Sequence, residues 1–155
     1  MPGYTLDPHR PILICEDNPN DVKLLTFAFT QAGITHPIQF VADGRQVLDY
    51  LAGREQFADR IAFPFPQVVI LDLKMPRLDG LQVLQWIKDH PECTVVPTII
   101  LTSSAHDGDI QEAYSLGANA YLVKPDSLPE LQRILRLTFD YWSTCAKPAV
   151  PARCA

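Results

Sequence analysis

Apolar residues in this chain are concentrated in short runs that end at charged or turn-forming residues. Four of these runs are continuously apolar, and they cover residues 12–15, 68–71, 98–101 and 120–123. Runs of this length without alternation are typical of strands buried on both faces, as in parallel sheets. A fifth run, at 37–41, alternates apolar and polar residues, which predicts a strand nearer the edge of the sheet.

The segments between these runs carry apolar residues at helical spacing. In the first of them, Asn18-Pro19 provides a start signal and Gly33 a stop signal, and the apolar positions between them are Val22, Leu25, Phe29 and Ala32. Five strands, at 11–15, 37–41, 68–71, 96–101 and 119–123, therefore alternate with five helices. This alternation predicts an α/β fold in which helices cover both faces of a parallel sheet.

The length of 155 residues is enough for one domain with a substantial core. We expect a lead-in over residues 1–10, one domain over 11–143 and a loose, Pro-rich tail over 144–155. The segment 53–66 is rich in Phe and Pro, which predicts an ordered loop packed on the surface; a role in partner binding is the alternative.

Composition and charge exclude several classes of protein. A hydrophobic content of 47% excludes a disordered chain, and a net charge of −5 argues against binding to nucleic acid. The sequence contains no run of 18 apolar residues and no signal pattern at its start, which predicts no membrane contact and a cytoplasmic location. The four cysteines show no metal-binding spacing; Cys15 is expected to be a buried apolar residue, and Cys145 and Cys154 could be oxidised in vitro.

Polar groups suited to metal and phosphoryl binding follow four of the predicted strands. Glu16-Asp17 follows the first strand, Asp72 the third, Thr102 the fourth and Lys124 the fifth. The carboxyl ends of parallel strands meet at one edge of the sheet, so these groups should lie together. Clustered carboxylates raise one another's pKa or hold a divalent cation, and an ammonium and a hydroxyl suit phosphoryl oxygens. Taken alone, Asp72 could equally be a cap or turn residue.

Five motifs, in order and spacing, resemble the receiver domain of two-component response regulators: Glu16-Asp17, Asp72 with Met75-Pro76, Asp79-Gly80, Thr102 and Lys124-Pro125. The resemblance covers about residues 10 to 143. It implies a flavodoxin-like (βα)5 three-layer sandwich with strand order 2-1-3-4-5. The first acidic loop, the longer segment before the third strand and Tyr141-Trp142 are most similar to stand-alone regulators that are paired with bacteriophytochrome-type histidine kinases.

The resemblance also implies a function. Asp72 is expected to accept a phosphoryl group from a sensor histidine kinase, with Thr102 and Lys124 contacting the phosphoryl oxygens. The implied cofactor is Mg²⁺, bound by Asp17, Asp72 and the backbone carbonyl of Lys74, and by Glu16 through water. Such a protein catalyses only its own phosphorylation and dephosphorylation, and it signals through protein contacts.

Two structural features come from the resemblance as well. Thr102 is expected to move toward the phosphate while Tyr121 turns inward; the alternative is that Tyr121 is only a core aromatic residue. The Lys124–Pro125 peptide bond is expected to be cis, as in the family, although cis bonds are a small minority of X–Pro bonds.

Three other functions fit these residues less well. A hydrolase of the haloacid-dehalogenase type needs a second Asp where this chain has Lys74, and no cap domain fits the length. A phosphate-independent binding module on the same fold would lack one of Asp17, Asp72, Thr102 or Lys124, and all four are present. A flavin or nucleotide binder is disfavoured because the first loop is acidic and contains no Gly.

The last predicted helix has two apolar stripes. Leu128, Leu131, Leu135, Phe139 and Trp142 form the expected core face. The second stripe contains Ile134, Leu137 and Tyr141. It could pack under a neighbouring helix or the tail; our prediction is that it forms a homodimer contact, as receivers often dimerise through this side of the domain.

Overall fold

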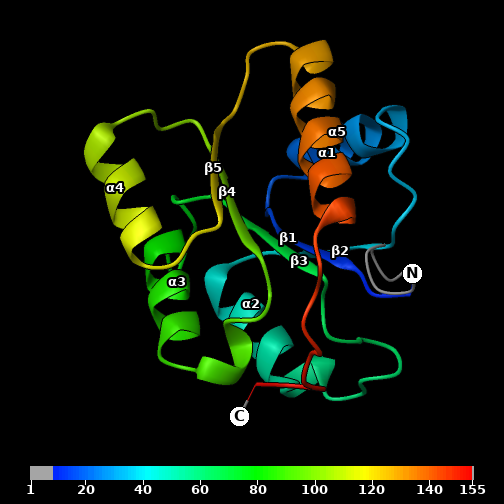
Figure 1. Cartoon of the computed structure of the whole chain (residues 1–155), viewed down its shortest axis with the longest axis vertical. Coiled ribbons are helices and arrows are strands. Elements are labelled where there is room, and N and C mark those ends of the chain that lie inside the picture. Colours follow the sequence, from blue (N-terminus) through cyan, green and yellow to red (C-terminus); the bar gives the residue numbers. More distant parts are fainter. Residues whose placement is uncertain (1–8, 155) are drawn as a thin grey trace.

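The computed structural model describes residues 9–154, which form one parallel sheet between two layers of helices (Figure 1). Its strands are β1 (Ile12–Cys15), β2 (Ile38–Val41), β3 (Val68–Leu71), β4 (Thr98–Thr102) and β5 (Ala120–Val123). They pair in the order β2-β1-β3-β4-β5, and every pair is parallel. The predicted flavodoxin-like fold and its strand order are confirmed.

Helices follow the strands as the sequence predicted. They are α1 (Pro19–Gln31), α2 (Gly44–Ala52), α3 (Gly80–Lys88), α4 (Asp107–Ser115) and α5 (Leu128–Thr144). Two short 3₁₀ helices, η1 (Glu55–Phe57) and η2 (Pro91–Cys93), were not predicted. No helix in residues 9–154 is long and apolar enough to cross a membrane.

Alternate side chains of each strand enter opposite layers of the core, because successive residues of a strand point to opposite faces. On β1, Ile12 and Ile14 pack in the layer that contains α1 and α5. Leu13 and Cys15 pack in the other layer, with α2, α3 and α4. All four residues are buried, which explains why this strand is apolar throughout.

Side-chain caps set the first residue of several helices. The Asn18 side chain accepts a hydrogen bond of 2.9 Å from Asn20 N, and Pro19 begins α1. At α5, Ser127 caps Glu130 N at 3.3 Å, but the Glu130 carboxylate bonds to Arg133. The sequence Ser127-Leu128-Pro129-Glu130 fits a capping box, but only its Ser127 half is formed.

The core face of α5 matches the prediction, whereas its second stripe is divided. Leu131, Leu135 and Phe139 are buried. Ile134 is partly buried and packs against the same core layer. In the single chain it therefore packs against a neighbouring part of the domain, which was the alternative given for the second stripe; a dimer contact through Ile134, Leu137 and Tyr141 stays a prediction. Leu137 and Tyr141 are 55% and 65% exposed.

The tail predicted to be loose is docked on the domain. Residues 146–154, which we call the C-terminal segment, run from the end of α5 to a disulfide between Cys154 and Cys93 of η2 (Figure 1). The predicted loop at 53–66 is also ordered, since Phe57 and Phe63 pack edge to face and both contact Tyr50.

Candidate functional site

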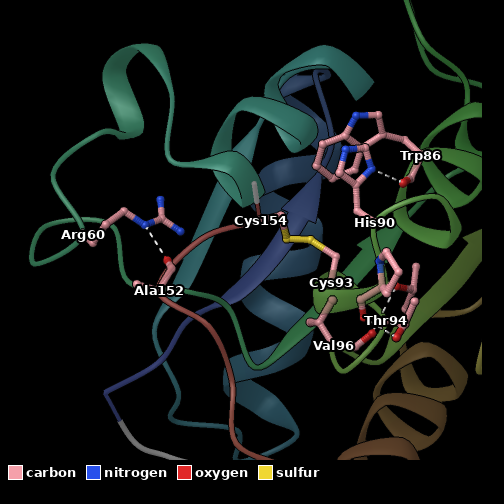
Figure 2. Close-up of a disulfide and its surroundings, with 10 residues drawn as sticks. Arg60, Trp86, His90, Cys93, Thr94, Val96, Ala152 and Cys154 are labelled. Carbon is pink, nitrogen blue, oxygen red and sulfur yellow. Dashed lines mark hydrogen bonds between the residues drawn. A yellow bond between two sulfur atoms is a disulfide. The ribbon is translucent and has the colours of Figure 1, made fainter.

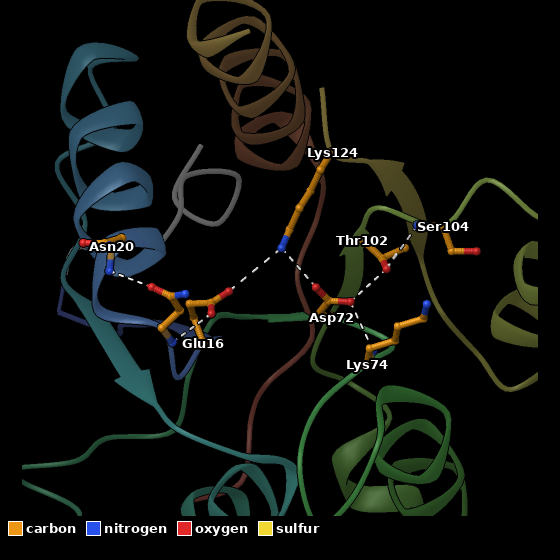
Figure 3. Close-up of polar contacts among 8 residues, drawn as sticks. Glu16, Asn20, Asp72, Lys74, Thr102, Ser104 and Lys124 are labelled. Atoms are coloured by element: carbon orange, nitrogen blue, oxygen red, sulfur yellow. Dashed lines mark hydrogen bonds and ion pairs between the residues drawn. The ribbon is translucent and has the colours of Figure 1, made fainter. Parts of the chain in front are cut away.

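Asp72 lies directly after β3, at the carboxyl edge of the sheet (Figure 3). The loop that follows is held close to the strand, because Gly80 N donates a 3.0 Å hydrogen bond to Leu73 O. A Cβ atom on Gly80 would lie 2.5 Å from the Asp72 carbonyl oxygen. Only glycine therefore allows α3 to begin so close to Asp72.

Three donors fix the Asp72 carboxylate. Thr102 Oγ1 donates to Asp72 Oδ1 at 2.8 Å, and Lys74 N donates to the same oxygen at 3.1 Å. Lys124 Nζ donates to Asp72 Oδ2 at 3.0 Å. The hydroxyl and the ammonium come from the ends of β4 and β5, so the sheet brings together the three residues that the sequence placed at its edge (Figure 3).

Glu16 and Asp17 directly follow β1. Glu16 lies on the side of Asp72 opposite to Thr102 (Figure 3). A cavity of about 230 Å³ is lined by both carboxylates, Asp72, Lys74 and Lys124. Lys124 Nζ is 3.9 Å from Glu16 Oε2, so its ammonium stands between two of the carboxylates. Burial raises the pKa of Glu16, although the Asn18 amide and Lys124 oppose that shift.

The predicted metal ligands share this cavity without forming a closed metal cage. Within residues 9–154, no three Asp, Glu, His or Cys side chains gather tightly enough to bind a metal on their own. The reason is visible at Asp72, whose oxygens face Thr102, Lys124 and the Lys74 amide. Oxygen ligands around an open cavity still fit Mg²⁺ or a similar cation, which binds one or two carboxylates and keeps several waters.

Thr102 and Tyr121 are connected through Ser104. Tyr121 Oη donates to Ser104 O at 2.9 Å, and Ser104 N lies 3.5 Å from Thr102 Oγ1. The Ser104 hydroxyl in turn donates to Asp109 Oδ2 at 2.5 Å, which ties it to the first turn of α4. Ser104 is not among the residues predicted for the site, although it belongs to the hydroxyl run Thr102-Ser103-Ser104 at the end of β4.

The peptide bond between Lys124 and Pro125 is trans, since residues 9–154 contain no cis peptide bond. The prediction of a cis bond is wrong here. It came from the family resemblance alone, against the strong general preference of X–Pro bonds for trans.

Comparison with known proteins shows one family. The response regulator receiver domain model matches residues 12–136. A probable methanogenesis regulatory protein, FilR2 of Methanothrix harundinacea, is 37% identical over 142 residues, which are 90% of this chain and 89% of FilR2.

Solved structures give the same result. Response regulator RPA3017, described in red light signaling of R. palustris, is 39% identical with a TM-score of 0.87, and the match covers 91% of this chain and 99% of that one. The Mn²⁺-bound form of response regulator Rcp1 is 29% identical with a TM-score of 0.79, covering 90% and 99%; Rcp1 is from Synechocystis. Further similar structures are response regulators of phytochromes and bacteriophytochromes.

Proposed function

Since this chain belongs to the response regulator receiver domain family, we propose that Asp72 is the residue that its phosphoryl donor modifies. The family is phosphorylated on an aspartate, and the chain is homologous to the response regulators of phytochromes. The observation that carries the assignment is the position of Asp72, a strand-end carboxylate contacted by both Thr102 and Lys124. We also propose residues 11–143 as the extent of the domain.

The contacts of Asp72 support a direct displacement at phosphorus. One carboxylate oxygen of Asp72 forms a bond to the phosphorus atom, and the bond from phosphorus to the donor's nitrogen or oxygen breaks. The Lys124 ammonium and the Thr102 hydroxyl lie close enough to bind two of the transferred phosphoryl oxygens. Their role is to stabilise negative charge that is concentrated there during transfer.

Receiver domains bind a divalent metal, and for this chain we propose Mg²⁺. Asp17, Asp72 and the Lys74 carbonyl would hold the ion, and Glu16 would act through water. When bound, the ion neutralises phosphoryl charge that would otherwise be repelled by the three carboxylates. The open cavity lined by all of these residues supports the assignment.

The output is proposed to be a change in protein contacts. Thr102 and Tyr121 would report the phosphoryl group, since Ser104 links both of them to α4. The phosphorylated form favours one of two arrangements of this region, so signalling is a shift in population. We infer that the chain is not otherwise an enzyme and does not bind nucleic acid, in keeping with its net charge of −5.

The proposed phosphoryl donor is a sensor histidine kinase of the phytochrome class. Support comes from RPA3017, which functions in red light signaling, and from the phytochrome regulators of similar structure. We place the protein in the cytoplasm, where such a kinase domain would meet it. A homodimer through Ile134, Leu137 and Tyr141 of α5 is part of the proposal, and Leu137 and Tyr141 are exposed in the single chain. A dimeric regulator would match a dimeric kinase, which raises the effective concentration at the kinase's two sites.

The assignment of Asp72 can be tested with acetyl phosphate and Mg²⁺. We expect intact-mass measurement to show the addition of one phosphoryl group to the wild type and none to Asp72→Asn. Asp79→Asn is the matched control: it removes the same charge nearby, and Asn can still cap α3 as Asp79 does. A chelator should prevent the reaction. A stable adduct on Asp72→Asn would assign the acceptor to another residue, with Asp17 the next candidate.

A further inference from the structure

Cys93 and Cys154 join two parts of the chain that are distant in sequence. They form a disulfide across a separation of 61 residues, with their Cα atoms 5.6 Å apart (Figure 2). That separation of Cα atoms is ordinary for a disulfide. Both cysteines are buried, one in η2 and the other at the far end of the C-terminal segment.

The C-terminal segment is attached to the domain by backbone hydrogen bonds as well as by the disulfide. Cys154 N donates to Leu51 O at 2.8 Å, and Arg60 Nε donates to Ala152 O at 2.9 Å. Val150 packs against the edge of the core, while Ala149 and Ala152 are exposed. Residues 146–154 form no helix or strand, and the disulfide is the covalent attachment at the far end of the segment.

This segment also covers a cavity at the amino edge of the sheet, away from Asp72. The cavity has a volume of about 140 Å³, and its apolar lining includes Val68, Trp142, Pro148 and Val150. Pro148 and Val150 belong to the C-terminal segment, so the cavity has this wall only when the segment is docked.

We propose that Cys93 and Cys154 are a reversible redox site that controls whether the C-terminal segment is docked over this cavity. In reducing compartments disulfides are typically transient or redox-sensing, so the cytoplasmic location proposed above agrees with a regulated bond. The remaining cysteines of residues 9–154, Cys15 and Cys145, are unpaired.

The reaction is thiol–disulfide exchange with a small disulfide such as oxidised glutathione. One protein thiol loses its proton and attacks the glutathione disulfide, releasing one reduced glutathione and leaving a mixed disulfide. The second protein thiolate then attacks the protein sulfur of that mixed disulfide and releases the second glutathione. Two protein thiols are oxidised and one glutathione disulfide is reduced, and excess dithiothreitol reverses the change.

The first experiment maps the bond. The full chain is equilibrated in glutathione buffers of increasing oxidation, free thiols are blocked with a maleimide under denaturing conditions, and peptides are identified by mass. We expect Cys93 and Cys154 to be protected together in oxidising buffer and to react after dithiothreitol, while Cys15 and Cys145 react in both. A bond from Cys145 to either partner, or no bond at all, would overturn the proposal.

The second experiment asks whether the bond controls docking. Hydrogen exchange in residues 146–154 should become faster by about tenfold or more on reduction, because the covalent attachment is lost while the sheet stays folded. Cys154→Ser should show the fast exchange in both buffers, and Cys145→Ser should respond like the wild type. The oxidised and reduced wild type have the same sequence, so a difference in exchange between them cannot come from a folding defect caused by a mutation. Equal exchange in its oxidised and reduced states would refute the control of docking.

Discussion

Lys124 Nζ lies 3.0 Å from Asp72 Oδ2, although the two residues follow β5 and β3, which are separated in the sheet by β4. The Lys124 side chain therefore reaches across the end of β4, where Thr102 donates to the other Asp72 oxygen. Any shift of β5 relative to β3 would change this ion pair. The pair thus joins the proposed phosphorylation site to the strand that also carries Tyr121.

Replacing Lys124 with Met should slow phosphorylation by acetyl phosphate about 10²-fold, because one preorganised charge on the phosphoryl oxygens is lost. The rate is read from intact mass against time. Lys23→Met, at an exposed position of α1, removes the same charge away from the site and should react like the wild type. An unchanged rate for Lys124→Met would remove Lys124 from the site.

Asp17→Asn should weaken Mg²⁺ binding by about tenfold or more, because the affinity of such sites depends on the number of charged ligands. Calorimetric titration with Mg²⁺ measures the effect directly. The metal-free variant should be no less stable than the wild type, since repulsion within the cluster of Glu16, Asp17 and Asp72 falls. Equal affinity in the two proteins would exclude Asp17 as a ligand.

The double variant Leu137→Glu with Tyr141→Glu should be monomeric where the wild type is dimeric. The two substitutions replace exposed apolar side chains of α5 with carboxylates, and these would repel the carboxylates of the second copy across a two-fold contact. Light scattering over a dilution series is the measurement. Ile61→Glu, at a residue that is 94% exposed in the 53–66 loop, is the control and should leave the dimer intact. A wild type that is monomeric at high micromolar concentration contradicts the proposal.

Reducing the disulfide should lower the free energy of unfolding by about 4 kcal/mol, as expected when the bond closes a loop of this length in the unfolded chain. The separation of Cys93 and Cys154 is 61 residues. Urea unfolding with and without dithiothreitol measures the difference, and Cys154→Ser should be insensitive to the reductant. A wild type of equal stability in both conditions would show that the bond is absent or strained.

Stability should also fall at high pH because of Tyr50. Burial raises the pKa of Tyr50 to about 12, and its hydroxyl donates to Pro64 O at 2.8 Å. An ordinary tyrosine ionises near 10, so between about 10 and 12 the unfolded chain releases a proton that the folded chain keeps. Stability therefore decreases as the pH rises through this range. As the pH rises through this range, the urea midpoint of the wild type should fall more steeply than that of Tyr50→Phe. Equal dependence on pH in the two proteins would contradict a raised pKa of Tyr50.

Much of the fold could be predicted because its signals are local. Ile12–Cys15 and Val68–Leu71 are apolar runs with polar ends; the second is a strand with the predicted bounds, and the first begins one residue later than predicted. The grouping of Asp72, Thr102 and Lys124 follows once the strands are taken as parallel, because their carboxyl ends then share one edge. No contact between side chains had to be known in advance.

The features that were missed depend on tertiary contacts. Ile134 packs against the core layer that α1 and α5 share, and a helical wheel of one helix does not show which neighbours cover each of its sides. The disulfide depends on the path of the C-terminal segment to η2, for which neither Cys93 nor Cys154 carries a spacing signal. The bond from Tyr121 Oη to Ser104 O likewise depends on how the loop after β4 folds back.

The position of β1 between β2 and β3 has a consequence for biosynthesis. Its two partners are β2, which follows soon after it in the chain, and β3, whose residue Val68 pairs with Ile12. A ribosome-bound chain that has emerged only as far as α2 therefore presents the strand Ile12–Cys15 with one edge unpaired, and that strand is apolar on both faces. Exposed edges of this kind favour pairing with other chains. In the interval before β3 emerges, the unpaired edge of β1 is therefore open to pairing with other chains.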